Sequence, residues 1–488
     1  MESLGKQAIQ GVKWSALKTA VGGIVGPITL IIKARYLSPE DFGYLAIILI
    51  VIGLFRLLES FGISQAIIQR DAVSSKESSS LFFFNILLSF ALAAALFAAA
   101  PLLSLAFGLA ELTEYLRLAC LVVLVTGPAL LFQAFLEKSM CFRQLALIGI
   151  ASQFFMLVGT FVLLELGFGL WAVVYAHVAG SLLTTVLIVF VALRRRLVRV
   201  TLYFSPRALG PFLRFGVFVS AKQLLTFAAH RLDEVLIGLF LTPEILGFYH
   251  FGKSMLEKLR SLMTASFSKV LYPVLSKLKH QPKKLALAYQ RISRYIAFAA
   301  FPVFGGIAAT AHLFVPIVFG EQWTDSVIVF QVFSVAVILL ALTANVATSL
   351  LYAVNRPALV FHIDLVTNAL YFASLFLLAS RGMVAVLLVY SAYVIYKTLT
   401  LQFFANRQLG EGYGRYVSVL AAPAGAALMM LAAVLAFQWL GAGLLGNAAL
   451  LAGSIAIGAL VYGLMAMIVA RETVEQLKQA MFKGEIAA

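Results

Sequence analysis

The sequence contains little charge, little cysteine and no long hydrophilic segment. Asp, Glu, Lys and Arg make up 12% of the 488 residues, and Cys120 and Cys141 are the only cysteines. Two cysteines in apolar surroundings offer neither a disulfide framework nor the spacing of a metal site. Hydrophilic segments stay below about two dozen residues, which is too few for a soluble domain with its own core. We therefore expect neither a metal site nor a separate soluble domain.

Catalytic patterns are also missing from the sequence. It has no glycine-rich loop of the kind that cradles phosphates, and no His-rich loop or paired carboxylates on a long segment outside the predicted membrane. We therefore expect a protein that is not an enzyme and that has no cofactor.

Long apolar runs dominate the sequence instead. It is 62% hydrophobic with a mean hydropathy of +0.99, and a helix needs roughly 20 apolar residues to cross a bilayer. Runs of this length predict an all-α polytopic membrane protein with fourteen transmembrane helices. The predicted spans are 12–36, 42–68, 81–107, 116–136, 145–166, 170–193, 212–240, 244–268, 293–318, 326–352, 358–379, 383–404, 416–440 and 444–470.

The net charge of +16 does not indicate a nucleic-acid partner, because the basic residues gather in loops on one side of the predicted membrane. On the side of the loops that follow odd-numbered spans, the basic residues are Arg381 and, at the end of the first span, Lys33 and Arg35. By the positive-inside rule, this asymmetry places both termini in the cytoplasm. The basic loop 269–294 also suits anionic membrane lipids, although topology alone is the preferred explanation of its charge.

The sequence contains an internal repeat around one hydrophilic turn. Residues 36–44 align without gaps on residues 240–248, at an offset of 204, and both copies carry a Pro-Glu pair with a glycine after it. The same offset relates two pairs of cations within predicted spans, Lys18 with Lys222 and Arg56 with Arg260. A shared turn and two shared cations in one register indicate a duplication.

Six predicted helices separate the two copies, so both copies run in the same direction through the membrane. The predicted architecture is therefore two parallel six-helix lobes around a central cavity, related by a pseudo-two-fold axis along the membrane normal. The N-terminal lobe takes residues 1–200 and the C-terminal lobe residues 201–410. Residues 411–488 supply two appended helices and a short cytoplasmic tail.

Charged side chains within spans are costly unless they face water or a partner, so they mark candidate functional sites. Five cations are predicted to make the central cavity positive: Lys18, Arg56, Lys222, Lys253 and Arg260. Four further candidates lie on the same helices: Glu59, His230, Asp233 and Glu257. Two of these acids lie three residues from an arginine, Glu59 from Arg56 and Glu257 from Arg260, so structural ion pairs remain an alternative.

Several short motifs resemble those of a known family. They are Gly11 to Ser15, Ala34 to Gly43, Ala66 to Arg70, Arg231 to Gly238, Tyr272 to Ser276 and Phe319 to Trp323. In combination they resemble the Wzx/TuaB-like polysaccharide transporters, a branch of the multidrug/oligosaccharidyl-lipid/polysaccharide flippase superfamily.

The resemblance implies a flippase that moves an undecaprenyl-pyrophosphate-linked oligosaccharide across the bacterial cytoplasmic (inner) membrane. The five cations would then attract pyrophosphate or acidic sugars, while Glu59, Asp233 and Glu257 would tune them or bind a coupling H+ or Na+. Polysaccharide polymerase or export machinery is an expected partner. The alternatives are a multidrug or cation antiporter of the same superfamily, an enzyme of lipid-linked sugar polymerisation and a scaffold for an export complex.

Overall fold

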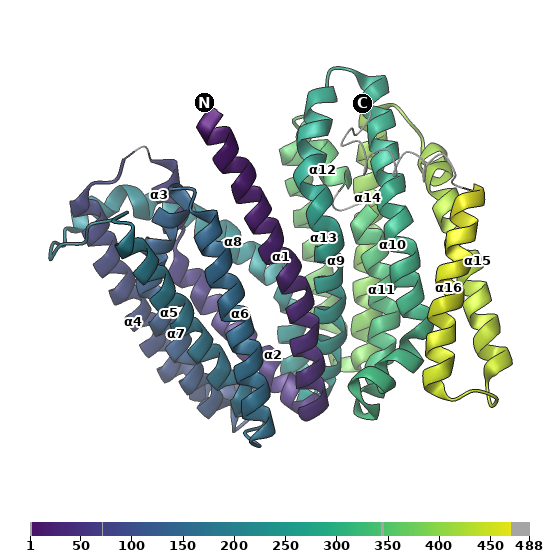
Figure 1. Ribbon diagram of the computed structural model, residues 1–488, viewed down its shortest axis with the longest axis horizontal. Helices are drawn as coiled ribbons and strands as arrows, with labels where there is room; N and C mark the ends of the chain where they lie inside the picture. The colour runs from purple at the N-terminus through teal and green to yellow at the C-terminus, as the bar shows by residue number, and fades with distance from the viewer. Residues whose placement is uncertain (1, 71, 343–345, 470–488) are drawn as a thin grey trace. The chain divides into compact units, whose positions relative to one another are not determined.

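The protein is built from helices throughout the residues that the structure describes. This computed structural model describes residues 2–70, 72–342 and 346–469. By their internal contacts the elements form two compact units, Met1–Gly247 and Phe248–Ala488. Figure 1 shows the helices of each unit.

Unit 1 is organised around α5, which packs against α4, α7, α2 and α3. Helix α6 joins α7 to α1, while α8 lies against α2, α3 and α4. The elements of this unit are α1 (Glu2–Tyr36), α2 (Pro39–Ser60), α3 (Ile63–Gln69), α4 (Ser75–Phe107), α5 (Leu112–Lys138), α6 (Phe142–Glu165), α7 (Leu170–Arg194) and α8 (Pro206–Phe240).

Unit 2 is organised around α10, which packs against α11, α15 and α16. Helices α11 and α13 both lie against α14. The elements are α9 (Pro243–Leu278), which begins in unit 1, α10 (Pro282–Phe319), η1 (Glu321–Ser326), α11 (Val327–Leu342), α12 (Val346–Ala353), α13 (Pro357–Leu378), η2 (Ala379–Arg381), α14 (Met383–Leu409), α15 (Tyr413–Gly441) and α16 (Asn447–Val469).

The turn between α1 and α2 follows from its sequence. The Asp41 backbone N–H donates to Ser38 Oγ at 3.1 Å, and the Ser38 backbone N–H donates to the Asp41 carboxylate at 2.9 Å. This reciprocal cap satisfies two backbone donors that a helix start leaves unpaired. Pro39 occupies the first turn of α2, where its missing N–H costs nothing. The predicted turn is therefore confirmed.

Large apolar side chains cover the outside of the helices, as lipid contact requires. On α4, for example, Leu102 and Leu105 are 70% and 79% exposed. Twelve helices among the described residues are long and apolar enough to cross a membrane, or thirteen when the bent helix α8 is counted as one span. The remaining predicted span, 244–268, falls on α9, which is helical but is not among those twelve or thirteen.

The two helices predicted as appended form a pair on the side of α10. Met430 and Val434 of α15 are buried in a cluster that includes Phe298 and Phe301 of α10. Tyr462 of α16 donates a hydrogen bond to the Phe298 carbonyl at 2.9 Å. The yellow end of the ribbon in Figure 1 shows this pair. The predicted lobe boundaries at residues 200 and 410, the axis and the central cavity stay predictions.

Candidate functional site

Helices α2 and α8 form an antiparallel pair inside unit 1. A Cβ built on Gly53 would lie 3.0 Å from the Phe227 ring, and one on Gly62 would lie 3.0 Å from the Gly216 Cα atom. The residue number therefore rises along α2 as it falls along α8. Gly53 allows the two helices to approach closely, and Gly62 does the same for the turn that follows α2.

Arg56 and Lys222 lie on this helix pair, in the stretch between those two contacts. Both side chains are exposed, whereas most residues of α2 that precede Arg56 are buried. The structure thus brings two predicted cations to the same depth on neighbouring helices. We therefore retain Arg56 and Lys222 as candidates for binding a polyanion such as pyrophosphate.

Lys18 lies elsewhere in unit 1, on the contact between α1 and α6. A Cβ on Gly149 of α6 would lie 3.0 Å from Lys18 Nζ, so the side chain runs along this glycine. On the same contact, the Arg143 guanidinium lies 5.4 Å from the Trp14 ring. Within unit 1, Arg56 and Lys222 therefore share a helix pair, while Lys18 occupies a different one.

Glu59 is buried between α2, α4 and α5. Its side chain is 1% exposed, and its carboxylate accepts hydrogen bonds from Ser89 Oγ at 2.7 Å and from Thr126 Oγ1 at 2.8 Å. In this part of the chain the carboxylate bonds to these hydroxyls, not to Arg56 three residues earlier. The two hydroxyls were not among the sequence candidates, because single serines and threonines are common in membrane helices.

The polar residues of α8 form two groups, one exposed and one largely buried. Lys222, Thr226 and His230 are exposed along one stripe, and His230 Nδ1 lies 2.8 Å from the Thr226 carbonyl. Asp233, another candidate on this helix, is only 3% exposed. Arg231 forms its ion pair with Glu234 at 2.9 Å. The partner is three residues away on the helix, a spacing from which the sequence could have identified it.

The remaining candidates, Lys253, Glu257 and Arg260, lie on the part of α9 that belongs to unit 2. Lys253 is 3% exposed, and its ammonium group lies 5.7 Å from the Tyr249 ring one turn earlier. Glu257 and Arg260 are half-buried. These side chains are therefore enclosed to a greater degree than Arg56 and Lys222.

Aromatic residues of α9 pack within unit 2. Phe251 is fully buried with its ring centroid 4.2 Å from that of Trp323, and Tyr249 packs edge-on against Phe333 at 5.4 Å. Such contacts stabilise the core.

Unit 2 also contains a polar cluster that the sequence left as separate residues. Lys397 of α14 pairs with Asp364 of α13 at 2.9 Å. Lys397 Nζ also donates to Tyr393 Oη at 3.2 Å, and that hydroxyl donates to Asn368 at 3.0 Å. Sequence spacing cannot reveal this cluster, because α13 and α14 come together only in the folded unit.

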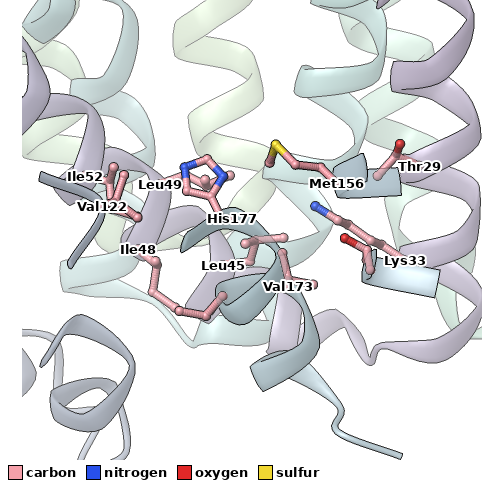
Figure 2. A pocket seen from close by; sticks show the side chains of 12 residues that line it. Thr29, Lys33, Leu45, Ile48, Leu49, Ile52, Val122, Met156, Val173 and His177 are labelled. Atoms are coloured by element: carbon pink, nitrogen blue, oxygen red, sulfur yellow. The ribbon is translucent and has the colours of Figure 1, made fainter. Parts of the chain in front are cut away.

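A small pocket opens inside unit 1 (Figure 2). Its walls are mostly apolar, and its polar lining residues are Thr29, Lys33, Thr160 and His177. Figure 2 shows the Lys33 and His177 side chains at this pocket. The pocket lies on the same helices as Glu59 and Thr126, since Ile52 of α2 and Val122 of α5 also line it.

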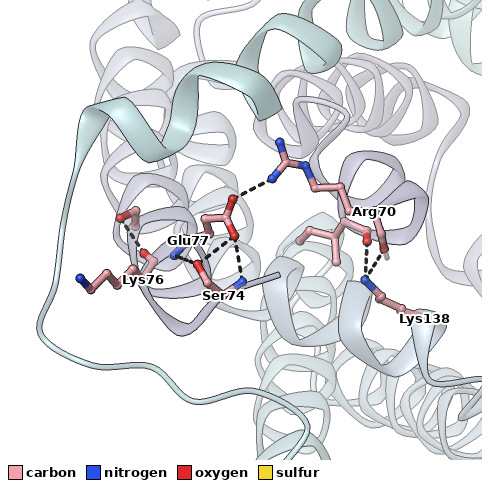
Figure 3. A network of polar contacts seen from close by, with 7 residues as sticks. Arg70, Ser74, Lys76, Glu77 and Lys138 are labelled. Carbon is pink, nitrogen blue, oxygen red and sulfur yellow. Dashed lines mark hydrogen bonds and ion pairs between the residues drawn. The ribbon is translucent and has the colours of Figure 1, made fainter. Parts of the chain in front are cut away.

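Arg70 closes one of the motifs noted in the sequence, and its contacts are structural. Its guanidinium pairs with Glu77 at 2.7 Å and lies 4.2 Å from the Phe212 ring, while its carbonyl accepts from Lys138 at 2.6 Å. Figure 3 shows this network at the start of α4. Arg70 therefore anchors the α3–α4 connection to α5 and α8.

The two copies of the repeated turn contact each other reciprocally. A Cβ on Gly43 would collide with the Pro243 carbonyl oxygen, and one on Gly247 would collide with the Pro39 carbonyl oxygen. The carbonyl carbons would lie 2.6 Å and 2.7 Å from these added atoms. Positions related by the 204 offset thus touch each other, as expected for copies that meet about a local two-fold axis.

Known proteins are similar to this chain in sequence and in fold. It is 25% identical over 425 residues to the lipopolysaccharide biosynthesis protein WzxC of Escherichia coli (strain K12), covering 86% of this chain and 85% of the relative. It is 24% identical over 384 residues to the teichuronic acid biosynthesis protein TuaB of Bacillus subtilis (strain 168), covering 78% of each.

The fold is similar to that of the lipid II flippase MurJ in its inward closed conformation. The TM-score is 0.73 at 16% sequence identity, over 96% of this chain and 100% of that structure. The predicted all-helical membrane fold is therefore confirmed. The model of a family described as polysaccharide biosynthesis protein matches residues 32–328, which is more than half of the sequence. The chain therefore belongs to this polysaccharide biosynthesis protein family.

Proposed function

We propose that the protein is a flippase for lipid-linked oligosaccharides. It moves an undecaprenyl-pyrophosphate-linked repeat unit from the inner to the outer leaflet of a bacterial cytoplasmic membrane by alternating access. Both termini face the cytoplasm. The names of the relatives support a substrate on the route to a cell-surface polysaccharide.

The observation that carries this proposal is the pair of exposed cations on α2 and α8. Arg56 and Lys222 are exposed at one depth of this helix pair, whereas Glu59 of the same pair is buried. Neither a sugar nor a pyrophosphate can cross hydrocarbon unaided, because desolvating polar and charged groups is costly. The guanidinium offers a bidentate contact to phosphate oxygens and the ammonium a compact charge.

The other candidates take supporting roles in this proposal. Lys18, Lys253 and Arg260 add positive charge for pyrophosphate or acidic sugars. The acids Glu59, Asp233 and Glu257, with His230, tune these cations or bind a coupling H+ or Na+. Polysaccharide polymerase or export machinery receives the product.

A multidrug or cation antiporter of the same superfamily is the alternative. Such a protein needs accessible carboxylates to bind a cationic drug. In unit 1 the acids of α2 and α8 that lie within the predicted spans, Glu59, Asp233 and Glu234, are all buried. The exposed charges of this helix pair thus favour an anionic substrate.

Reconstitution tests the proposal directly. Proteoliposomes with the protein and an undecaprenyl-pyrophosphate-linked oligosaccharide should move the sugar across the bilayer. We expect Arg56→Ala or Lys222→Ala to lower the rate on the order of 10-fold, because each removes a charge-assisted contact.

Two controls complete this experiment. Lys222→Arg keeps the charge and should retain most of the rate. Lys283→Ala removes an exposed lysine at the start of α10 and should leave the rate unchanged. Full transport by the Arg56→Ala, Lys222→Ala double variant would refute the proposed substrate site.

A further inference from the structure

Glu59 lies in a chain of closely spaced oxygen atoms. Each hydroxyl that contacts its carboxylate also contacts a backbone carbonyl of its own helix. Ser89 Oγ lies 2.8 Å from the Asn85 carbonyl oxygen, and Thr126 Oγ1 lies 2.9 Å from the Val122 carbonyl oxygen. Together with the two contacts to Glu59, this makes four short O···O contacts in one row.

The number of protons in this row depends on the state of Glu59. Carbonyl oxygens only accept, and each hydroxyl donates one proton. An ionised Glu59 therefore leaves two protons for four contacts. A neutral carboxyl supplies a third proton, so that three of the four contacts become hydrogen bonds. Burial of the side chain favours the same neutral state, because an ionised carboxylate inside the membrane carries a large desolvation cost.

The surroundings of Glu59 are polar but neutral on two sides. Asn85 of α4, one turn before Ser89, is fully buried, and neither atom of its amide has a hydrogen-bond partner in the described structure. Such an amide can bind a water molecule beside the carboxyl. On α5, a Cβ at Gly127 would lie 3.0 Å from Glu59 Oε1, so glycine keeps this side open for the carboxyl.

Charged groups lie on the remaining sides. Arg56, one turn earlier on α2, acts electrostatically on Glu59 and also on His177 in the neighbouring pocket. Lys222 of α8 lies at the same level of the helix pair. Lys33 is the other charged group of the pocket. When Glu59 loses its proton, the positive charge of Arg56 acts to compensate it.

We propose that Glu59, with its shell of Asn85, Ser89 and Thr126, is the binding site for an exchangeable proton that couples transport to the pH gradient. The inference rests on the proposed transport function and deepens it, since it selects one proton site from the coupling candidates. The proton is exchangeable because the neutral form has more hydrogen bonds, while Arg56 stabilises the ionised form.

Infrared spectroscopy tests the proton itself, without any transport. The protein in lipid at neutral pH should show the C=O stretching band of a protonated carboxyl, and this band should be missing in Glu59→Gln. The matched control is Glu137→Gln, since Glu137 of α5 also accepts hydrogen bonds, from Ser64 and Gln133, but is half-buried. Identical spectra for the wild type and Glu59→Gln would overturn the inference.

A second variant, in a residue that contacts Glu59, keeps the inference testable if Glu59→Gln fails to fold. Thr126→Val keeps the shape of the side chain and removes one hydroxyl from the row. It should shift the carboxyl band, because a hydrogen bond to the carboxyl is lost. An unshifted band in Thr126→Val would also count against the inference.

Transport in proteoliposomes tests the coupling. An imposed pH gradient should change the wild-type rate severalfold, whereas Glu59→Gln should transport at one rate with or without the gradient. A Glu59→Gln rate that still follows the pH gradient, or a wild-type rate that follows only a sodium gradient, would overturn the inference. If the wild type moves no lipid-linked oligosaccharide at all, the proposed function fails, while the infrared result still decides whether Glu59 holds a proton.

Discussion

The charged side chains of unit 1 differ in burial and in their hydrogen-bond partners. Arg56 and Lys222 are exposed on α2 and α8, while Glu59 is enclosed by hydroxyl groups of α4 and α5. Burial separates these residues more clearly than their charge does. A carboxylate and a cation three residues apart on one helix can therefore have different roles, because they point to different neighbours.

Arg231 and Glu234 form a partly buried ion pair whose loss should destabilise the protein. Glu234 is 1% exposed and Arg231 is 35% exposed, at 2.9 Å. Arg231→Gln leaves the buried carboxylate without this partner, and we expect it to lower the free energy of unfolding by about 2 kcal/mol. Thermal unfolding of the purified protein measures the loss. The Arg231→Gln, Glu234→Gln double variant should recover part of it, and a single variant as stable as the wild type would contradict the prediction.

At the scale of helices, glycines determine where the elements of unit 1 touch. Gly53, Gly62 and Gly127 each face a neighbouring helix at a distance that a larger side chain would change. Helix association in membranes depends on such close packing, because lipid and protein interiors are equally apolar. Gly127 leaves room for Glu59 between α2, α4 and α5, while Gly53 and Gly62 bring α8 close to α2 and to the turn after it.

Gly43 and Gly247 should be the least tolerant of these glycines. A Cβ at either position meets backbone atoms of the opposite turn, which cannot rotate away as a side chain can. Gly43→Ala and Gly247→Ala should each lower the free energy of unfolding by about 1–3 kcal/mol through overpacking. Thermal unfolding in detergent provides the measurement.

The matched control for these variants is Gly306→Ala in α10. Gly306 is also helical, but an added Cβ there meets nothing within 4 Å. Alanine has the higher helix propensity, so this variant should be as stable as the wild type or slightly more stable. Equal stability of the Gly43, Gly247 and Gly306 variants would show that the reciprocal contact does not restrict these positions.

At the scale of the whole chain, the distribution of positive charge predicts which loops face the cytoplasm. The basic connection before α10 belongs on the inside, and the connection between α15 and α16 on the outside. Both native cysteines are buried, so a thiol reagent should report mainly on an introduced cysteine.

Cysteine labelling tests this topology. A membrane-impermeant maleimide should label Ala442→Cys in intact cells, because Ala442 is exposed between α15 and α16. It should label Gln281→Cys only after the membrane is permeabilised, since Gln281 is exposed in the basic connection. The wild-type protein, which carries only its two native cysteines, controls for background labelling. The reverse labelling pattern would place both termini outside the cytoplasm.

The sequence by itself determined the fold class, the approximate helix boundaries and the family. Apolar runs of sufficient length must become helices in a membrane, because every backbone N–H and C=O group then bonds within its own segment. The turn at Pro39 and the residues of its cap follow from local chemistry for the same reason. The repeat at an offset of 204 also pointed to the pair of turns that contact each other.

Only the tertiary structure decided which polar residues share a site. It separated Lys18 from Arg56 and Lys222, surrounded Glu59 with hydroxyls, and paired Lys397 with Asp364. The sequence placed the predicted cations correctly within helices but could not assign their neighbours. The physical reason is that spacing along a chain defines the faces of one helix, whereas the partner of a buried charge comes from whichever helix packs against that face.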